Sequence, residues 1–347
     1  MTSVSRAPAA TTPREAGFSQ PAEWALHEAC WIAWPSHEDL WGAGLEPVRD
    51  AWVEMARAIG EGERLEVLVP DAGGESLARE RLAGLDVRLH RIPFGDIWLR
   101  DTAPVFLTGP SGERACACFE FNGWGEKYVL PHDAEVSAKV AAASSLPTFR
   151  LPFILEGGSV ETDGEGTCLT TRQCLLNPNR NPGMTAADVE TSLRDALGVE
   201  RILWLGEGLR NDHTDGHIDT IARFVAPASV VCMRPSGPDD PNGSALTRVE
   251  EALRSFRDAG ERRLEVTTIP SPGRVLDPGG EVLPASYLNF YVGNRAVVVP
   301  VFGVPTDAGA IAAIGRLFRG RKAVGVPACD LLTGGGAFHC ITQQVPA

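Results

Sequence analysis

Features that mark membrane-bound, secreted or nucleic-acid-binding proteins are missing from this 347-residue sequence. It has no run of about 18 or more apolar residues, the length at which a membrane-spanning helix becomes a candidate. Residues 1–14 lack the apolar stretch of a secretory signal, and we expect a short disordered tail there. The net charge of −13 argues against nucleic acid or an anionic membrane as partner and is compatible with a small cationic substrate.

Paired cysteines are also missing. A disulfide framework is typical of short secreted chains, so we expect reduced thiols in a cytoplasmic protein. Most of the cysteines stand in apolar runs and are predicted to be small core residues. The eight scattered residues, none in a Cys-x-x-Cys arrangement, are Cys30, Cys116, Cys118, Cys168, Cys174, Cys232, Cys329 and Cys340.

What the sequence does contain is a strand–helix–strand unit that occurs five times. In the first unit, strands at residues 30–35 and 65–69 flank a helix that carries Val48, Trp52 and Met55 at helical spacing. This unit is followed by a further helix at 75–84 and a strand at 87–92. The later units pair strands at 115–121, 168–176, 220–233 and 296–302 with helices from Asp133, Thr185, Thr247 and Asp307 and with strands at 148–152, 201–205, 264–269 and 322–326.

Five similar units predict a closed, propeller-like α/β arrangement, and a doubly wound sheet is the alternative. Four polar clusters each follow a predicted strand, namely the strands that end at residues 92, 152, 205 and 326. If the units surround an axis, these loops meet at one end and bring carboxylates, a histidine and a thiol to one pocket. The clusters lie at residues 98–102, 155–159, 212–219 and 334–340.

Each cluster has a plainer interpretation. His217 and Asp219 have the spacing of a general acid/base beside a carboxylate, but a polar surface loop would look the same. His213 and His217 are four residues apart, as in helical zinc sites, yet the intervening residues are poor helix formers and we expect no metal. Three glycines ahead of Cys340 favour a tight path into a crowded site, and an inert buried thiol is the alternative.

Seven motifs occur in order along the chain: WLRDT at 98–102, FNGWG at 121–125, LEGG at 155–158, LLNPNRNP at 175–182, TDGHID at 214–219, SYLNFY at 286–291 and GGGAFHCITQQ at 334–344. Together they resemble the agmatine deiminase family. This family is a branch of the guanidine-modifying superfamily that includes bacterial peptidylarginine deiminases. The resemblance implies a five-bladed α/β propeller, the pentein fold, as a single domain over residues 15–347. It also implies a homodimer and no metal or other cofactor.

The resemblance implies roles for individual residues as well. Cys340 matches the nucleophile and His217 the general acid/base. Asp101 and Asp219 match the carboxylates that hold the guanidinium. The further residues expected to line the substrate site are Glu156, Asp212 and Trp98.

The implied reaction is hydrolysis of agmatine to N-carbamoylputrescine and ammonia through a covalent amidino-cysteine, a step of putrescine biosynthesis. One alternative is a deiminase of free arginine or peptidyl-arginine, whose additional carboxylate or peptide would need other partners, such as an arginine. A non-catalytic binding protein on the same fold is a third reading. It would require the loss of Cys340, His217 or a clamp carboxylate, and all are present.

The sequence departs from the family pattern at three places. Ala337 and Phe338 stand where asparagine and isoleucine are usual, Ala103 replaces a glycine, and Glu126 replaces another. These positions lie near the expected pocket. They affect the identity of the substrate more than the type of reaction, and Phe338 is expected to narrow the pocket.

Overall fold

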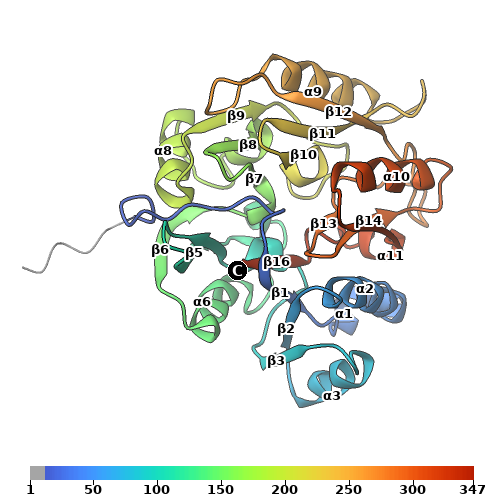
Figure 1. Cartoon of the computed structure of the whole chain (residues 1–347). Helices are drawn as coiled ribbons and strands as arrows, with labels where there is room; N and C mark the ends of the chain where they lie inside the picture. Colours follow the sequence, from blue (N-terminus) through green and yellow to red (C-terminus); the bar gives the residue numbers. More distant parts are fainter. Residues whose placement is uncertain (1–11) are drawn as a thin grey trace, which may run out of the picture.

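Five separate small sheets surround a common axis and form the blades of a ring (Figure 1). The computed structural model describes residues 12–347, so residues 1–11 of the predicted disordered tail lie outside the described part. One sheet has four strands and the other four have three. The predicted five-bladed propeller is therefore confirmed, and the doubly wound alternative is wrong.

Four blades share one plan: an antiparallel strand pair, followed by a helix that crosses to a third strand parallel to the second. Blades two and three consist of β4 (Val105–Thr108), β5 (Arg114–Glu120), α6 (Asp133–Ser144) and β6 (Thr148–Ile154), then β7 (Val160–Thr162), β8 (Thr167–Thr171), α8 (Ala186–Leu197) and β9 (Arg201–Leu205). Blades four and five consist of β10 (Ala222–Ala226), β11 (Ser229–Arg234), α9 (Gly243–Ser255) and β12 (Glu265–Pro270), then β13 (Tyr291–Val292), β14 (Ala296–Val301), α10 (Asp307–Leu317) and β15 (Lys322–Pro327).

The first blade is completed by the end of the chain. Its strand order is β16-β1-β2-β3, so the C-terminal strand pairs antiparallel with the first strand, Ala29 facing Val345. Together the two ends close the ring. The elements of this blade are β1 (His27–Ala33), α2 (Leu45–Gly60), β2 (Arg64–Val69), α3 (Ala72–Arg81), β3 (Val87–Arg91) and β16 (Thr342–Pro346).

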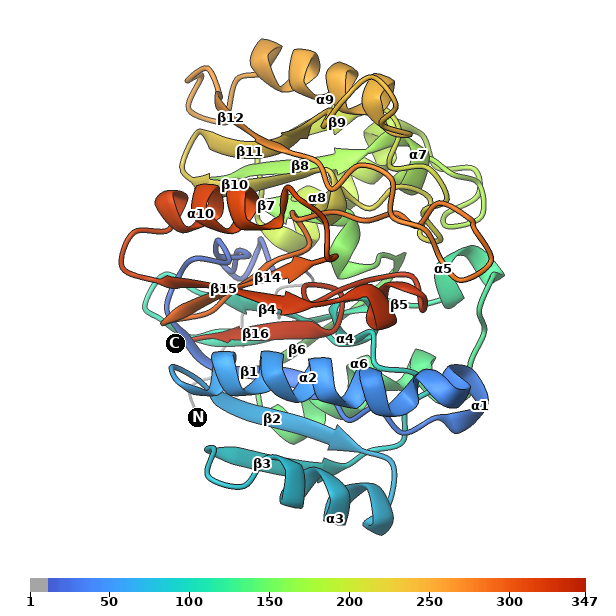
Figure 2. The same ribbon diagram turned by 90° about the vertical axis from the view of Figure 1, so that its right-hand side faces the viewer.

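Short helices and 3-10 turns lie at the ends of the strands, and three of them carry parts of the polar clusters at 98–102, 155–159 and 212–219. Figure 2 shows α1 and α5 at one end of the ring, opposite the end at which the C-terminus lies. The short helices are α1 (Glu38–Trp41), α4 (Leu99–Thr102), α5 (Gly123–Glu126), α7 (Arg172–Leu175) and α11 (Cys329–Leu332), and the 3-10 turns are η1 (Gly42–Gly44), η2 (Gly157–Ser159) and η3 (Ile218–Thr220).

The long helices form where the hydrophobic spacing predicts them, and they bury that face against their sheets. In α2 the predicted residues Val48, Trp52 and Met55 are fully buried. The start of α8 has the predicted capping box, in which Thr185 and Asp188 bond each other's backbone N–H. These local signals are sufficient to predict the helices from the sequence, because capping and amphipathic spacing depend on residues only a few positions apart.

Several predicted boundaries are wrong. Strand β1 is His27–Ala33 rather than 30–35, and helix α3 is Ala72–Arg81 rather than 75–84. The strand at 168–176 ends at Thr171, whose side chain accepts a hydrogen bond from the Cys174 N–H and starts α7. The stretch 220–233 is a hairpin of two strands, with Ala228 in the left-handed region at its turn. Helix α9 begins at Gly243 rather than Thr247. The sequence signal for this earlier start is weak because glycine is a poor helix former.

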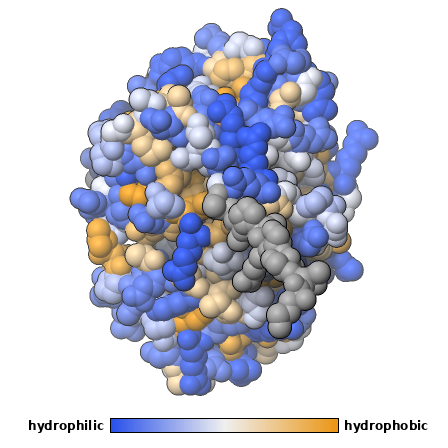
Figure 3. All heavy atoms as spheres, turned by 90° about the vertical axis from the view of Figure 1, so that its left-hand side faces the viewer, coloured by the Kyte–Doolittle hydropathy of each residue, from blue (hydrophilic) through white to orange (hydrophobic). Residues whose placement is uncertain are grey.

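The outer surface is mostly polar on the side that carries α6 and α8. In Figure 3, which views this side, hydrophilic residues predominate and hydrophobic residues form small separate groups. Over residues 12–347, none of the helices combines the length and apolar character that crossing a membrane requires.

Candidate active site

Loops from four blades bring five of the predicted site residues together. Asp101 lies in α4, and Glu156 directly precedes η2. His217 directly precedes η3, and Asp219 lies within it. Cys340 lies between α11 and β16, just before the ring closes. All five side chains are buried, and Asp101 and Cys340 are the most accessible at 6% each. The predicted convergence of the loops is confirmed by these positions.

The sulfur of Cys340 is surrounded by two polar side chains. Asp219 Oδ2 lies 3.6 Å from Sγ, and Asn289 Nδ2 donates to Sγ at 3.0 Å. The same Nδ2 is 3.1 Å from Asp219 Oδ2, while Asn289 Oδ1 accepts from the backbone N–H of Ala337 at 3.1 Å. Sequence reasoning missed Asn289. The signal in the sequence is the motif at residues 286–291, to which the family resemblance assigns no individual role.

The Asp101 carboxylate is held in place from both sides. Its Oδ1 accepts the N–H of Gly158 at 2.9 Å, and its Oδ2 accepts the indole N–H of Trp124 at 2.9 Å. A side chain at Gly158 could not fit, because a Cβ there would come within 2.6 Å of His217 Nδ1. The glycine of the LEGG motif therefore lets a backbone donor approach the centre of the site.

The His217 ring lies between two carboxylates. Its Nδ1 is 3.8 Å from Asp101 Oδ2, and its Nε2 is 3.9 Å from Glu156 Oε2. Glu156 is fixed in turn by Arg180, whose Nε donates to Oε1 at 2.8 Å. Within the described residues, neither ring nitrogen of His217 has a partner at hydrogen-bond distance. Both remain available to a ligand of the site.

This environment determines which groups of the site carry protons. Burial raises the pKa of the Cys340 thiol well above its usual range, and Asp219 and Asp101 add to the effect. Burial alone would lower the pKa of His217, but Asp101, Cys174 and Glu156 together hold it well above its ordinary value. These protein groups therefore favour a neutral Cys340 thiol and a His217 imidazolium at neutral pH.

A cavity of about 270 Å³ opens onto Cys340 and Asp101. Its size is close to the lower limit of small-molecule sites, about 300 Å³. The predicted residue Trp98 lines it, together with other aromatic side chains. The complete lining is Leu40, Trp41, Asp96, Trp98, Asp101, Trp124, Tyr128, Leu130, His213, Thr214, Thr333, Gly334, Gly335, Gly336 and Cys340.

Three sequence expectations differ from this lining. Glu156, expected to line the site, is not among the lining residues, and neither are His217 and Asp219. Asp212 is not among the lining residues, and its Oδ1 accepts from the backbone N–H and the hydroxyl of Thr214. Phe338 does not narrow the cavity, because it is fully buried in the main hydrophobic core and does not line it. The expectation for Phe338 is therefore wrong. Although Phe338 is two residues from Cys340 in the sequence, its side chain packs into the hydrophobic core instead of the cavity.

A possible metal-ligand set also differs from the one considered in the sequence. Glu156, Cys174 and His217 offer ligand atoms within 4.8 Å of one another, and all three are buried. Asp212 and His213 do not belong to this set in the part of the chain that the structure describes. Arg180 donates to Glu156 in the same cluster, and its positive charge disfavours a metal cation there.

The chain is similar to known deiminases over almost its whole length. Residues 19–346 match the Porphyromonas-type peptidyl-arginine deiminase family. The chain is 38% identical to agmatine deiminases of Ectopseudomonas mendocina and of Pseudomonas aeruginosa, over 97% of this chain and 98% of each relative. The solved structure of the agmatine deiminase of Enterococcus faecalis superposes with a TM-score of 0.92. It is 32% identical and covers 99% of both chains.

Proposed function

The chain belongs to the Porphyromonas-type peptidyl-arginine deiminase family, and on this premise we propose that it hydrolyses the guanidinium group of agmatine. The products are ammonia and N-carbamoylputrescine, a precursor of putrescine. One observation carries the proposal: the Cys340 thiol and the Asp101 carboxylate face the same small cavity. Asp219 adds a second carboxylate, 3.6 Å from the sulfur.

In the proposed complex, Asp101 and Asp219 hold the guanidinium. A guanidinium is planar and presents forked N–H donors that match carboxylates. Asp219 Oδ1 is buried and has no hydrogen-bond partner among the described residues, so it is a ready acceptor for such a donor. This pairing places the central carbon beside Cys340, and positioning of this kind can lower a barrier by up to about 7–11 kcal/mol.

The substrate itself supports activation of the nucleophile. The two carboxylates add to the effect of burial in raising the pKa of Cys340, and a bound cation would offset their charge. The thiol then loses its proton to solvent as the guanidinium binds. Asn289 contributes a hydrogen bond to the resulting thiolate, because its Nδ2 already faces Sγ at 3.0 Å.

The reaction proceeds in two halves. Cys340 attacks the guanidinium carbon and forms a tetrahedral adduct, and the His217 imidazolium donates a proton to the departing amine, which leaves as ammonia. The remaining amidino-thioester is attacked by water, and neutral His217 removes the proton of that water. The C–S bond then breaks, which releases N-carbamoylputrescine and restores Cys340.

The cavity lining favours an ammonium over a carboxylate at the other end of the substrate. Aromatic side chains of Trp41, Trp98 and Tyr128 line the cavity, and aromatic rings attract cations. Neither arginine nor lysine occurs among the described residues that line the cavity. Agmatine has an ammonium at the end opposite its guanidinium, whereas free arginine has an additional carboxylate that would lack a partner. This difference supports agmatine over the arginine alternatives.

The proposal is tested by ammonia release from agmatine, free arginine and a peptidyl-arginine substrate. Wild-type protein should turn over agmatine with the highest kcat/KM. Cys340→Ala should reduce turnover by at least about 10⁴-fold, since removing a nucleophile costs up to about 10⁶-fold in comparable enzymes. The matched control is Cys329→Ala, which removes an exposed thiol outside the cavity and should leave turnover unchanged.

Two results would contradict the proposal. Turnover by Cys340→Ala at the wild-type rate would exclude this sulfur as the nucleophile. A kcat/KM for arginine above that for agmatine would exclude the assigned substrate and leave the guanidine chemistry intact.

Cellular location and assembly stay predictions. A cytoplasmic location is supported by the eight free thiols, which suit a reducing compartment. Sedimentation of the purified protein tests the expected homodimer, and a monomer would contradict it.

A further inference from the structure

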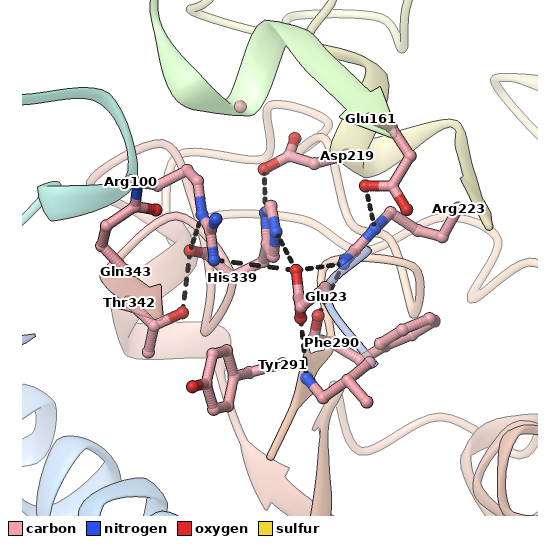
Figure 4. Close-up of polar contacts among 12 residues, drawn as sticks. Glu23, Arg100, Glu161, Asp219, Arg223, Phe290, Tyr291, His339, Thr342 and Gln343 are labelled. Carbon is pink, nitrogen blue, oxygen red and sulfur yellow. Dashed lines mark hydrogen bonds and ion pairs between the residues drawn. The ribbon is translucent and has the colours of Figure 1, made fainter. Parts of the chain in front are cut away.

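His339, the residue before Cys340, connects two buried carboxylates. Figure 4 shows its ring between Asp219 on one side and Glu23 on the other. Nδ1 lies 2.7 Å from Asp219 Oδ2, and Nε2 lies 2.8 Å from Glu23 Oε2. All three side chains are buried. Glu23 belongs to the segment before β1, so the beginning of the described chain contacts the centre of the site.

These two distances determine the protonation of the ring. An ionised carboxylate can only accept hydrogen bonds, so each short contact requires a proton on the nitrogen that faces it. Burial acts to raise the pKa of Glu23, but Arg223, His339 and Arg100 together lower it well below its usual range. Burial also acts to raise the pKa of Asp219, and His339 is the first group that lowers it. Both carboxylates are therefore ionised, and both nitrogens of His339 carry protons.

The surrounding charges fit an imidazolium. Arg223 donates from Nη2 to Glu23 at 2.6 Å and from Nε to Glu161 at 2.9 Å (Figure 4). Burial raises the pKa of Glu161, yet both of its oxygens accept hydrogen bonds, the second from the Phe224 N–H, and these two donors favour the ionised form.

A charged His339 matches the cations of this network to its anions. Arg100 Nη2 lies 3.7 Å from Glu23 and is the second guanidinium of the group. With a charged His339, three cations face the three carboxylates of Glu23, Glu161 and Asp219, and His217 adds a further positive charge near Asp219. Such pairing offsets the cost of burying the carboxylates.

We propose that His339 is a positioning residue, whose two ring nitrogens bridge Glu23 and Asp219 and so orient Asp219 for the substrate's guanidinium. This inference rests on the proposed function for its role, but not for the charge of the ring. The groups that face His339 and Asp219 are Glu23 from the N-terminal segment, Arg100 from α4, Arg223 from β10, His217 before η3 and Cys340 beside the ring.

The charge of the ring can be measured without substrate. Nitrogen NMR of protein with ¹⁵N-labelled histidine distinguishes an imidazolium from either neutral tautomer. Because each nitrogen faces a carboxylate, both ring nitrogens of His339 should carry protons under the conditions of the kinetic assay. The signal is assigned by its change in Glu23→Gln, which removes one of the two carboxylates. A neutral His339 in the wild-type protein would overturn the proposal.

The positioning role is tested by kinetics with His339→Gln and Glu23→Gln. Glutamine cannot donate to both carboxylates, so Asp219 loses its fixed partner. We expect kcat/KM for the preferred guanidine to fall about 10- to 100-fold, as for other residues that orient a site group. His90→Gln is the matched control, because His90 pairs with Glu66 on an outer strand and should give wild-type kinetics.

A pH profile separates this role from a merely structural one. Ionised Asp219 is lost as the pH falls through its lowered pKa, and removing His339 raises that pKa. The acidic limb of kcat/KM should therefore move to higher pH in His339→Gln and stay in place in His90→Gln. An unmoved limb in folded His339→Gln would overturn the role. Wild-type protein that hydrolyses no guanidine would refute the proposed function, while the NMR result still decides the charge of His339.

Discussion

Asn289 uses both ends of its side-chain amide on the segment that contains Cys340. Its Nδ2 donates to the sulfur, and its Oδ1 accepts the N–H of Ala337. In Asn289→Ala the thiolate loses a donor, and in Asn289→Asp it also faces a new carboxylate. A hydrogen bond to a charged group contributes about 1.5–3 kcal/mol, and 1.36 kcal/mol corresponds to one pKa unit.

We therefore expect the alkylation of Cys340 by iodoacetamide to require a higher pH in both variants. The midpoint should rise from wild type to Asn289→Ala by about one unit, and further in Asn289→Asp. Mass spectrometry of the Cys340 peptide over a pH series measures this order. If Asn289→Asp reacted at a lower pH than Asn289→Ala, Asn289 would not stabilise the thiolate.

The charge of His217 depends on its two carboxylate neighbours. Because its pKa is raised, the imidazolium persists at neutral pH and is lost as the pH rises through that raised value. In Glu156→Gln one cause of the raised pKa is gone, so the alkaline limb of the agmatine kcat/KM profile should move to lower pH. A limb that stays in place or moves to higher pH would refute the assignment of this limb to His217. Thermal unfolding of Glu156→Gln checks that its fold is retained.

Sequence motifs identify residues that act through local patterns, and they miss residues that act across the chain. Cys340 and His217 stand in motifs whose residue types suit the chemistry, and the structure places both in one site. Glu23 contacts His339 from 316 positions away, and neither residue has a neighbour that suggests this contact. A buried ion-pair network of this kind can be identified only from the folded structure, which brings the two ends of the chain together.

At the scale of the element, the glycine-rich turn before Cys340 is shaped by close packing. A Cβ on Gly336 would come within 2.8 Å of the Trp98 ring and 2.9 Å of the Cys340 sulfur. Gly336→Ala should displace one of these groups and lower the agmatine kcat/KM by about 10²-fold, the usual effect of a shift of about 1 Å at a reacting group. Steady-state kinetics provides the measurement.

The control for this variant is Gly309→Ala in α10. A Cβ at Gly309 meets nothing within 4 Å, and alanine is the better helix former. This variant should keep wild-type kinetics and gain up to about 0.5–1 kcal/mol of stability. Wild-type kinetics in Gly336→Ala would show that the turn has room to relax.

The predictability of an element depends on where its stabilising partners lie. The start of α8 is set by Thr185 and Asp188, three residues apart, and the sequence predicts it correctly. The sequence does not predict strand β16. Its partner β1 lies at the other end of the chain, and pairing over this distance produces no local sequence pattern. Strands β4, β7 and β13 are four residues or shorter, and such segments are too short for an alternating pattern to stand out.

At the scale of the whole molecule, the closed ring should unfold as one unit. Leu253 of α9 is fully buried in the fourth blade, outside the hydrophobic cluster that contains Cys340. Leu253→Ala should cost about 2–5 kcal/mol and lower the unfolding temperature seen by calorimetry. The temperature at which Cys340 becomes accessible to iodoacetamide should fall by the same number of degrees. Leu276→Ala, at a side chain that is 48% exposed, should change stability by less than about 0.5 kcal/mol. Separate transitions for the thiol and for the heat signal would contradict a single unit.

The pairing of β16 with β1 also has a consequence for the protein during its synthesis. The first blade stays incomplete until β16 has left the ribosome, after the other four blades have been synthesised. Cys340 lies two residues before the start of β16. A nascent chain therefore carries an unfinished sheet edge and no nucleophile for most of translation. Completion of the fold and synthesis of the Cys340 thiol therefore nearly coincide, so a chain that ends before residue 340 would have an open ring and no active-site nucleophile.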